Sequence, residues 1–303
     1  MKDIVKYITT YTRKINIGVF AASTVLTAIM IYINFHYDVD RWIDAQSTAT
    51  TFLFRYLTFL TAFALPYFFY FFQGKNYFKH PLILLLIFLS PAIFSWKMVM
   101  PTGLPLSTDA SWNYYWNQVT YWPIRLVVMS FILFIIWKMF YSKESFFGLT
   151  RQKFNWRPYL LMLLIMVPLI AAASTQRDFL NMYPRLRDVD PVLYTVNNRW
   201  FYHLLHELSY GSDFISVELF FRGFLILAFI KIAGTDAILP MACFYCTIHF
   251  GKPLGECISS YFGGIILGVI VYNTRSILGG LMVHLGIAWL MELGGHIGNS
   301  LFK

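Results

Sequence analysis

Four polar side chains lie inside the apolar C-terminal third of the chain, at spacings that could support acid–base chemistry. The segment "VELFFRGF" contains Glu218 and Arg222, which share a helix face because they are four residues apart. His249 closes the next apolar segment, and His284 lies in the last one. A charge at bilayer depth is costly, so such residues usually face a packed interior or a water-filled cavity and have a partner.

One carboxylate and two imidazoles could together activate water. Glu218 or a histidine would take the proton, and a histidine donor would stabilise the oxyanion that develops on the attacked carbonyl. At 1.5 Å per residue, Glu218 lies about 13 Å into its helix and His284 about 10 Å into its own, so we expect them to meet in one cavity. The alternative is structural: Arg222 would only neutralise Glu218, and each histidine would be a satisfied core residue.

Other polar residues are weaker candidates. One glutamate and two histidines could bind zinc, but no HExxH motif is present, and "HLLHE" at 203–207 has the wrong order. Cys243 and Cys246 form a single CxxC, so we expect small buried hydrophobes rather than a metal or redox site. Glu292 and His296 fall near the end of the last helix, where we expect water. The sequence therefore predicts no metal and no cofactor.

Composition indicates a membrane protein. Of the 303 residues, 58% are hydrophobic and only 13% are charged, whereas soluble domains carry about 25% charged residues. Long continuous apolar runs exclude the short alternating strands of a β-barrel. We predict an all-α, polytopic integral membrane helical bundle of about eight or nine transmembrane helices. The candidate helices are approximately 15–35, 51–72, 81–99, 123–141, 158–174, 209–232, 237–250, 255–273 and 277–294.

The unusual polar residues are concentrated in the last four candidate helices. We therefore divide one integral membrane domain into residues 1–208, which supply membrane helices and extramembrane loops, and residues 209–303, which form the functional core. Basic residues before the first helix place the N-terminus in the cytoplasm, and the loops at 98–122 and 175–208 outside. The net charge of +9 fits such anchoring, and with no nucleic-acid motif we expect membrane lipids as partners and no nucleic acid.

The segments "VELFFRG", "YCTIH" and "YFGGIILGVIVYNTRSILGGLMVH" resemble the family of CAAX prenyl proteases and bacteriocin-processing enzymes (CPBP). The family pattern is Glu-Glu-x-x-x-Arg, then Phe-x-x-x-His, then a last His usually followed four residues later by Asn, and the likeness covers about residues 212–294. The resemblance implies an all-helical intramembrane fold and, in active members, metal-independent peptide-bond hydrolysis by glutamate-activated water. Eukaryotic relatives trim prenylated CAAX proteins, and bacterial relatives are linked to peptide maturation, self-immunity or regulation.

The resemblance assigns roles to five residues. Glu218 corresponds to the second glutamate, Arg222 to the arginine, His249 to the second-motif histidine and His284 to the last histidine, while Tyr245 replaces the phenylalanine. The resemblance therefore implies that Glu218, His249 and His284 are catalytic. Arg222 and Tyr245 would support them.

Two positions depart from the family pattern. The first glutamate, which active members use as the base, is Val217, and the asparagine position is Ala288. Valine cannot take a proton, and alanine cannot donate a hydrogen bond from its side chain. Asp213, one helical turn before Val217, could substitute through a water molecule.

Two functions follow from these observations. The first is an intramembrane endopeptidase, CAAX protease-like, in which Glu218 and His249 activate water and His284 steadies the oxyanion. The second is a catalytically impaired relative that acts as a membrane scaffold, an immunity factor or a regulator. A transporter would show two related halves, which the sequence lacks. We expect a peptide or membrane-protein substrate and a place in the bacterial inner membrane.

Overall fold

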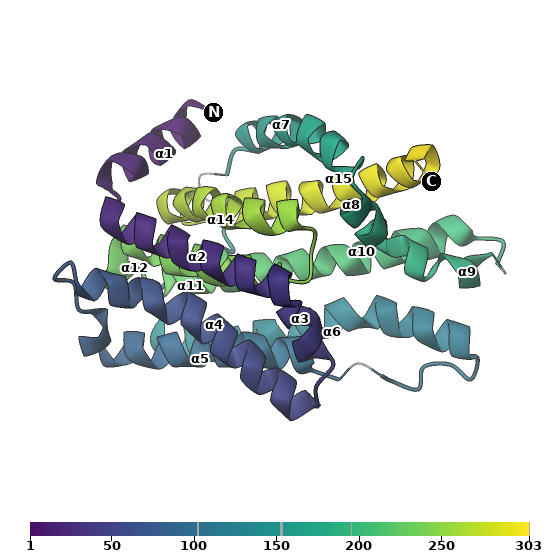
Figure 1. Cartoon of the computed structure of the whole chain (residues 1–303), viewed down its shortest axis with the longest axis horizontal. Coiled ribbons are helices and arrows are strands. Elements are labelled where there is room, and N and C mark those ends of the chain that lie inside the picture. The colour runs from purple at the N-terminus through teal and green to yellow at the C-terminus, as the bar shows by residue number, and fades with distance from the viewer. Residues whose placement is uncertain (102, 152–153, 195, 303) are drawn as a thin grey trace. The chain divides into compact units, whose positions relative to one another are not determined.

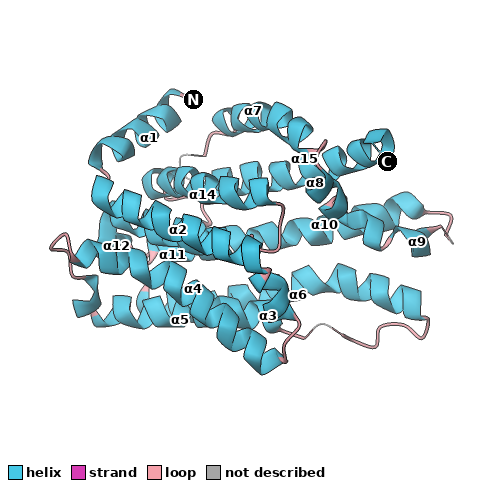
Figure 2. Cartoon of the chain, in the orientation of Figure 1, coloured by secondary structure: helices cyan, strands magenta, loops and turns pink. Residues whose placement is uncertain are grey.

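The computed structural model describes residues 1–101, 103–151, 154–194 and 196–302. These residues form helices and contain no strand (Figure 2). Six helices are long and apolar enough to cross a membrane: α2 (Ile17–Tyr37), α4 (Thr48–Phe71), α5 (Pro81–Val99), α6 (Ala110–Phe140), α14 (Leu254–Thr274) and α15 (Leu278–Phe302). The prediction of an all-helical membrane protein is confirmed. The other three predicted spans coincide with shorter or interrupted helices.

The chain folds into two compact units, each assembled from three separate stretches. The first unit consists of Met1–Met100, Lys143–Phe154 and Phe221–Ile277. The second unit consists of Pro101–Ser142, Asn155–Phe220 and Leu278–Lys303. Figure 1 allows these stretches to be followed by colour from purple at the N-terminus to yellow at the C-terminus. The division predicted after residue 208 concerned function and not compactness, so it stays a prediction.

The first unit is built around α13 (Ile238–Thr247), which packs against α2, α4 and α14. All residues of α13 are buried, and this explains how a helix too short to span a bilayer can be so apolar. Its other helical elements are α1 (Lys2–Lys14), α3 (Val39–Asp44), η1 (Tyr77–Lys79), α5, η2 (Phe146–Gly148), α11 (Leu225–Leu227), α12 (Ile230–Ala233) and η5 (Gly234–Ala237).

Aromatic rings form the core of the first unit. Phe244 of α13 contacts Phe59, Phe63 and Phe94 of α4 and α5, with ring centroids 5.0, 5.7 and 5.9 Å away. Phe221 joins the same cluster at 5.1 Å from Phe244. These rings have almost no exposed surface, so their burial contributes a large share of the packing energy of this unit.

The second unit is centred on α10 (Arg199–Glu218), which packs against α6 and α15. Helix α15 also packs against α7 (Arg157–Ala173) and α8 (Arg177–Met182). Two short elements, η3 (Arg185–Asp188) and α9 (Asp190–Leu193), complete the segment between α8 and α10.

Two predicted boundaries are wrong. The loop predicted at 98–122 ends early, because α6 begins at Ala110, where the Asp109 side chain caps the helix by accepting a hydrogen bond from the Trp112 amide at 2.9 Å. The single helix predicted at 209–232 is interrupted after Glu218 by η4 (Leu219–Phe224), a π-helix. Such wider turns are rare and occur frequently at functional sites.

Candidate functional site

Glu218 and His284 meet in the second unit. Glu218 is the last residue of α10, and His284 lies about two turns into α15, which begins at Leu278. The Oε1 atom of Glu218 is 2.9 Å from Nδ1 of His284. The glutamate side chain has no exposed surface, and the imidazole is 13% exposed. The edge of the Phe214 ring packs on the imidazole, with ring centroids 4.8 Å apart.

The geometry of this pair defines which imidazole nitrogen faces the acid. An ionised carboxylate only accepts hydrogen bonds, so Nδ1 of His284 carries the hydrogen and donates it to Glu218. The other ring nitrogen, Nε2, faces away from the Glu218 carboxylate. Carboxylate–imidazole pairs of this kind orient the ring and stabilise its protonated form.

A glycine allows the close approach of α10 and α15 at this point. A Cβ atom added at Gly280, one turn before His284, would lie 2.6 Å from Oε2 of Glu218. Any larger residue would therefore displace the carboxylate or the helix. The sequence "LGGLMVH" thus supplies both the imidazole and the space for its acidic partner.

Arg222, Tyr245 and His249 lie together in the first unit. The Arg222 guanidinium carbon stands 3.7 Å from the centre of the Tyr245 ring, a cation–π contact. The same ring contacts the His249 imidazole edge-on, with centroids 4.7 Å apart. Nδ1 of His249 donates to the Tyr245 carbonyl oxygen at 3.0 Å. Tyr245 therefore contributes a ring to Arg222 and a carbonyl to His249.

The two departures from the family pattern are buried apolar residues. Val217, beside Glu218 in α10, is 6% exposed, and Ala288, one turn after His284 in α15, is 3% exposed. Asp213 accepts a hydrogen bond from the Ser216 hydroxyl at 3.0 Å and lies near enough to Arg125 of α6 to interact with its charge. Its proposed role as a substitute base stays a prediction.

The sequence prediction is wrong for Glu292. We expected this residue to approach water, but it is 7% exposed and accepts hydrogen bonds from the backbone amides of Arg185 and Leu186 at 3.0 and 3.4 Å. It therefore holds the chain between α8 and α9 against α15. The available signal was that Glu292 lies on the same face of the last helix as His284. The sequence could not identify its partner, because that residue lies more than 100 positions away. His296 is exposed, as expected.

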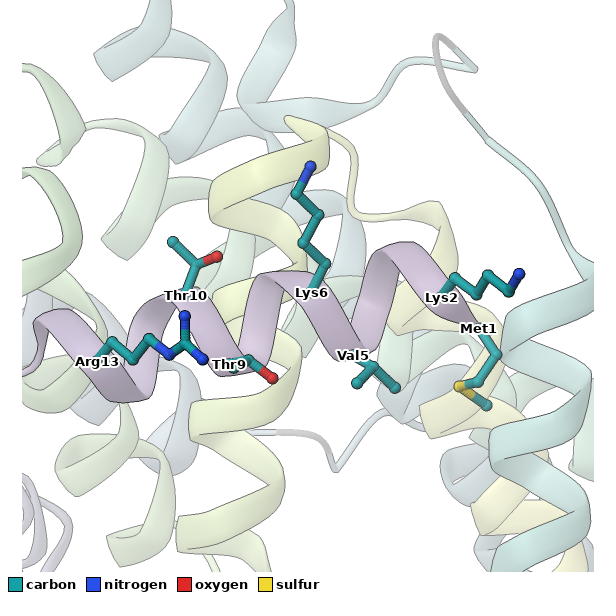
Figure 3. Close-up of a pocket in the computed structure, with 7 residues that line it drawn as sticks. All are labelled: Met1, Lys2, Val5, Lys6, Thr9, Thr10 and Arg13. Carbon is teal, nitrogen blue, oxygen red and sulfur yellow. The ribbon is translucent and has the colours of Figure 1, made fainter.

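No group of three or more histidine, cysteine or acidic residues is placed to hold a metal within the described part of the chain. Cys243, Cys246 and Cys257 are free thiols and are buried, as expected, and the thiols of Cys246 and Cys257 lie 3.9 Å apart. An open groove of about 540 Å³ runs along α1 and is lined by Lys2, Lys6 and Arg13 among other residues (Figure 3).

Residues 213–290 match the family model described as "Type II CAAX prenyl endopeptidase Rce1-like". Over this segment, about a quarter of its length, the chain is similar to the CAAX prenyl endopeptidases of the CPBP family. Neither the curated proteins nor the solved structures contain a match to it. The apolar helices indicate an integral membrane protein, and its segment 213–290 is CAAX protease-like.

The matched segment contains all the motif residues of this protein. Glu218 and His284 belong to the second unit, and Arg222, Tyr245 and His249 belong to the first. The η4 turn, between Glu218 and the rest of the motif, is therefore also where the chain passes from one unit to the other.

Proposed function

We propose that this protein is an intramembrane endopeptidase in which Glu218 and His284 act as one unit to activate water. The observation that carries the proposal is the 2.9 Å bond between a fully buried carboxylate and a partly exposed imidazole. A buried charge is tolerated only with a partner. Here the partner is the one side-chain type that takes up and releases protons near neutral pH.

In the proposed reaction, the water oxygen attacks the peptide carbonyl carbon while its proton passes to Nε2 of His284. Glu218 keeps the ring oriented and stabilises the imidazolium that forms. The carbon–nitrogen bond then breaks, and the proton moves from Nε2 to the leaving amine. The products are a new carboxyl terminus and a new amino terminus, with no net change in the protonation of the pair.

The pair offers a physical answer to the loss of the first family glutamate. Because Val217 cannot accept a proton, the imidazole of His284 takes that role and Glu218 serves as its partner. Assistance by His249 and Arg222 rests on the motif alone. Asp213 remains the alternative source of a second carboxylate.

The finer features of the protein are proposals of the same kind. The substrate is a peptide or a membrane protein, and the membrane is the inner membrane of a bacterium, with a cytoplasmic N-terminus. The basic groove on α1 supports contact with anionic lipid headgroups at that surface. Helices α7, α10 and α13 would bring the number of helices in the membrane to eight or nine.

The test is turnover of a peptide library by the full-length protein in detergent, followed by mass spectrometry. We expect cleavage by the wild type and its loss in Glu218→Ala and His284→Ala, with His249→Ala reporting whether the third residue takes part. The matched control is His296→Ala, an exposed histidine in the same helix as His284. Equal cleavage by the wild type and both test variants would disprove the proposal.

Val217 and Ala288 favour a second candidate, a CPBP-like protein that binds peptides without cleaving them and acts as a scaffold, an immunity factor or a regulator. This candidate predicts no cleavage of any library member by the wild type. It also predicts that a Val217→Glu, Ala288→Asn variant gains cleavage, because both missing groups are restored. Cleavage by the wild type would eliminate this candidate.

A further inference from the structure

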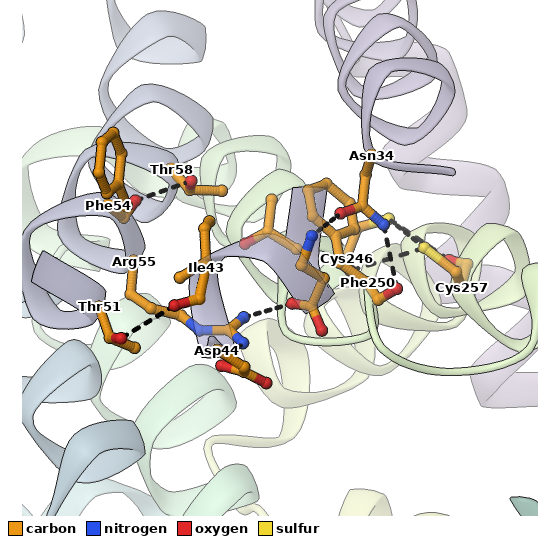
Figure 4. A network of polar contacts seen from close by, with 12 residues as sticks. Asn34, Ile43, Asp44, Thr51, Phe54, Arg55, Thr58, Cys246, Phe250 and Cys257 are labelled. Carbon is orange, nitrogen blue, oxygen red and sulfur yellow. Dashed lines mark hydrogen bonds and ion pairs between the residues drawn. The ribbon is translucent and has the colours of Figure 1, made fainter. Parts of the chain in front are cut away.

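The turn that carries His249 is tied to the corner between α2 and α3. The Asn34 side-chain amide donates a hydrogen bond to the carbonyl oxygen of Phe250 at 3.0 Å (Figure 4). The oxygen of the same side chain accepts from the Asp40 amide at 2.9 Å. Asn34 is buried, so these two bonds replace those it would make with water. One asparagine thus links the α2–α3 corner to the residue that follows His249.

Arg55 of α4 fixes that corner from the other side. Its guanidinium bonds the Asp40 carboxylate through one terminal nitrogen and the Asp44 carboxylate, at 2.5 Å, through the other (Figure 4). Arg55 is 5% exposed although it lies in a membrane-spanning helix. The planar guanidinium holds its two acids in a fixed geometry. Asp40 therefore has little freedom to move.

Asp40 also lies directly against the backbone of the turn. A Cβ atom added at Gly251 would be 2.6 Å from Oδ2 of Asp40. At Gly255, the second residue of α14, an added Cβ would meet no atom within 4 Å. The contact with Asp40 is therefore specific to the part of the turn beside His249.

The orientation of His249 depends on this backbone. Its ring donates to the Tyr245 carbonyl and packs on the Tyr245 ring, while Thr247 ends α13 and Pro253 precedes α14. The ring is attached outside the regular helix. Its position therefore follows the turn, and the turn is fixed by the contacts of Phe250 and Gly251.

We propose that Asn34, Asp40 and Arg55 are positioning residues for His249 and act through the turn at 248–253. The inference rests on the proposed function, in which His249 is the second-motif histidine. The three residues come from the N-terminal 60 positions of the chain, outside the matched family segment. A displacement of a reacting group by about 1 Å can lower a rate by about 10²-fold. Loss of these contacts should therefore lower the turnover rate.

The experiment compares Gly251→Ala with Gly255→Ala in the full-length protein in detergent. We expect Gly251→Ala to lower kcat by about tenfold or more, with a smaller change in KM, and Gly255→Ala to match the wild type. In an Asp40→Ala background the opposing carboxylate is gone, so Gly251→Ala should cause little further loss. Wild-type kcat in Gly251→Ala, or an equal loss with and without Asp40, would overturn the inference.

A second readout does not depend on activity. The ring nitrogen signals of His249 are recorded by NMR with ¹⁵N-histidine and assigned by their absence in His249→Gln. We expect Asn34→Leu to shift these signals. The control is Thr27→Val, which removes a hydrogen bond from α2 to Cys243 in the body of α13.

The two readouts separate the inference from the proposed function. A His249 signal that shifts in Asn34→Leu, while the wild type cleaves no peptide, supports the positioning role of Asn34 and counts against the proposed endopeptidase function. An unshifted His249 signal in Asn34→Leu overturns the positioning role, whatever turnover is measured. Detergent-solubilised thermal unfolding of each variant checks that the protein is folded.

Discussion

Two buried glutamates of the second unit, Glu218 and Glu292, have different hydrogen-bond partners. Glu218 bonds an imidazole across the interface between α10 and α15, whereas Glu292, within α15, bonds two backbone amides before α9. Both satisfy the rule that a buried charge needs partners. Their partners differ in one property, because an imidazole can gain and lose a proton and a backbone amide cannot.

That difference separates a reactive site from a structural one. The backbone amides of Arg185 and Leu186 use Glu292 only as a hydrogen-bond acceptor. These bonds attach the segment between α8 and α9 to α15. Under the proposed function, the imidazole beside Glu218 passes a proton to the substrate, and the glutamate orients the ring. Burial and charge alone would not have distinguished the two residues; the partner does.

The largest expected effect comes from replacing each acid by its amide. Glu218→Gln should lower kcat by about 10²- to 10⁴-fold, the usual contribution of acid–base catalysis, with little change in thermal unfolding. Glu292→Gln should leave kcat within about twofold of the wild type, because it touches no reacting group. Steady-state cleavage of one library peptide measures both. Equal losses in the two variants would remove the distinction between the sites.

Removal of the Glu292 side-chain acceptor should act on stability. Glu292→Leu leaves two half-buried backbone amides without their acceptor, at a cost of about 2 kcal/mol. The matched change, His296→Leu at an exposed position of the same helix, should cost less than about 0.5 kcal/mol. Denaturation in mixed micelles, followed by intrinsic fluorescence, measures the free energy of unfolding. An unchanged midpoint for Glu292→Leu would show that these bonds contribute little.

A smaller effect is expected from crowding the reactive pair. Gly280→Ala places a methyl group against Oε2 of Glu218 and should lower kcat by about tenfold through displacement of the carboxylate. Gly263→Ala, in α14, is the control, because its added Cβ would meet no atom within 4 Å. If both variants cleave at the wild-type rate, the carboxylate position is not critical.

The smallest effect should come from Tyr245. Tyr245→Phe restores the family residue and keeps the ring under Arg222 and the carbonyl that accepts from His249. We expect kcat to change by less than about twofold. Tyr245→Ala, which removes the ring, should be clearly more harmful. A large loss in Tyr245→Phe would mean that the hydroxyl, rather than the ring, has the functional role.

Much of the fold could be predicted because it follows from continuous apolar runs. The six membrane-spanning candidates coincide with predicted segments, since a run of about 20 apolar residues has few alternatives to a helix. Boundaries were less predictable. The start of α6 depends on an Asp109 cap inside an aromatic segment, and the π-helix η4 follows from no pattern of hydrophobicity.

The partners of polar residues were the least predictable part of the site. The sequence suggested Arg222 as the partner of Glu218, because the two residues are four positions apart on a helix. The structure brings Glu218 to His284 and Arg222 onto the Tyr245 ring, and helical spacing predicts neither contact. An arginine inside a predicted span, such as Arg55, signals that a partner exists, but helical spacing does not identify it.

The central claim is that the Glu218–His284 pair adds water to a peptide bond. Cleavage in ¹⁸O-labelled water measures this most directly, because the oxygen of the attacking water ends in the new carboxyl terminus. We predict one ¹⁸O atom in that terminus from the wild type, and labelled product formed at least about 10²-fold more slowly by Glu218→Gln at matched protein concentration. Labelled product at the same rate from both proteins, or unlabelled product from the wild type, would contradict the account.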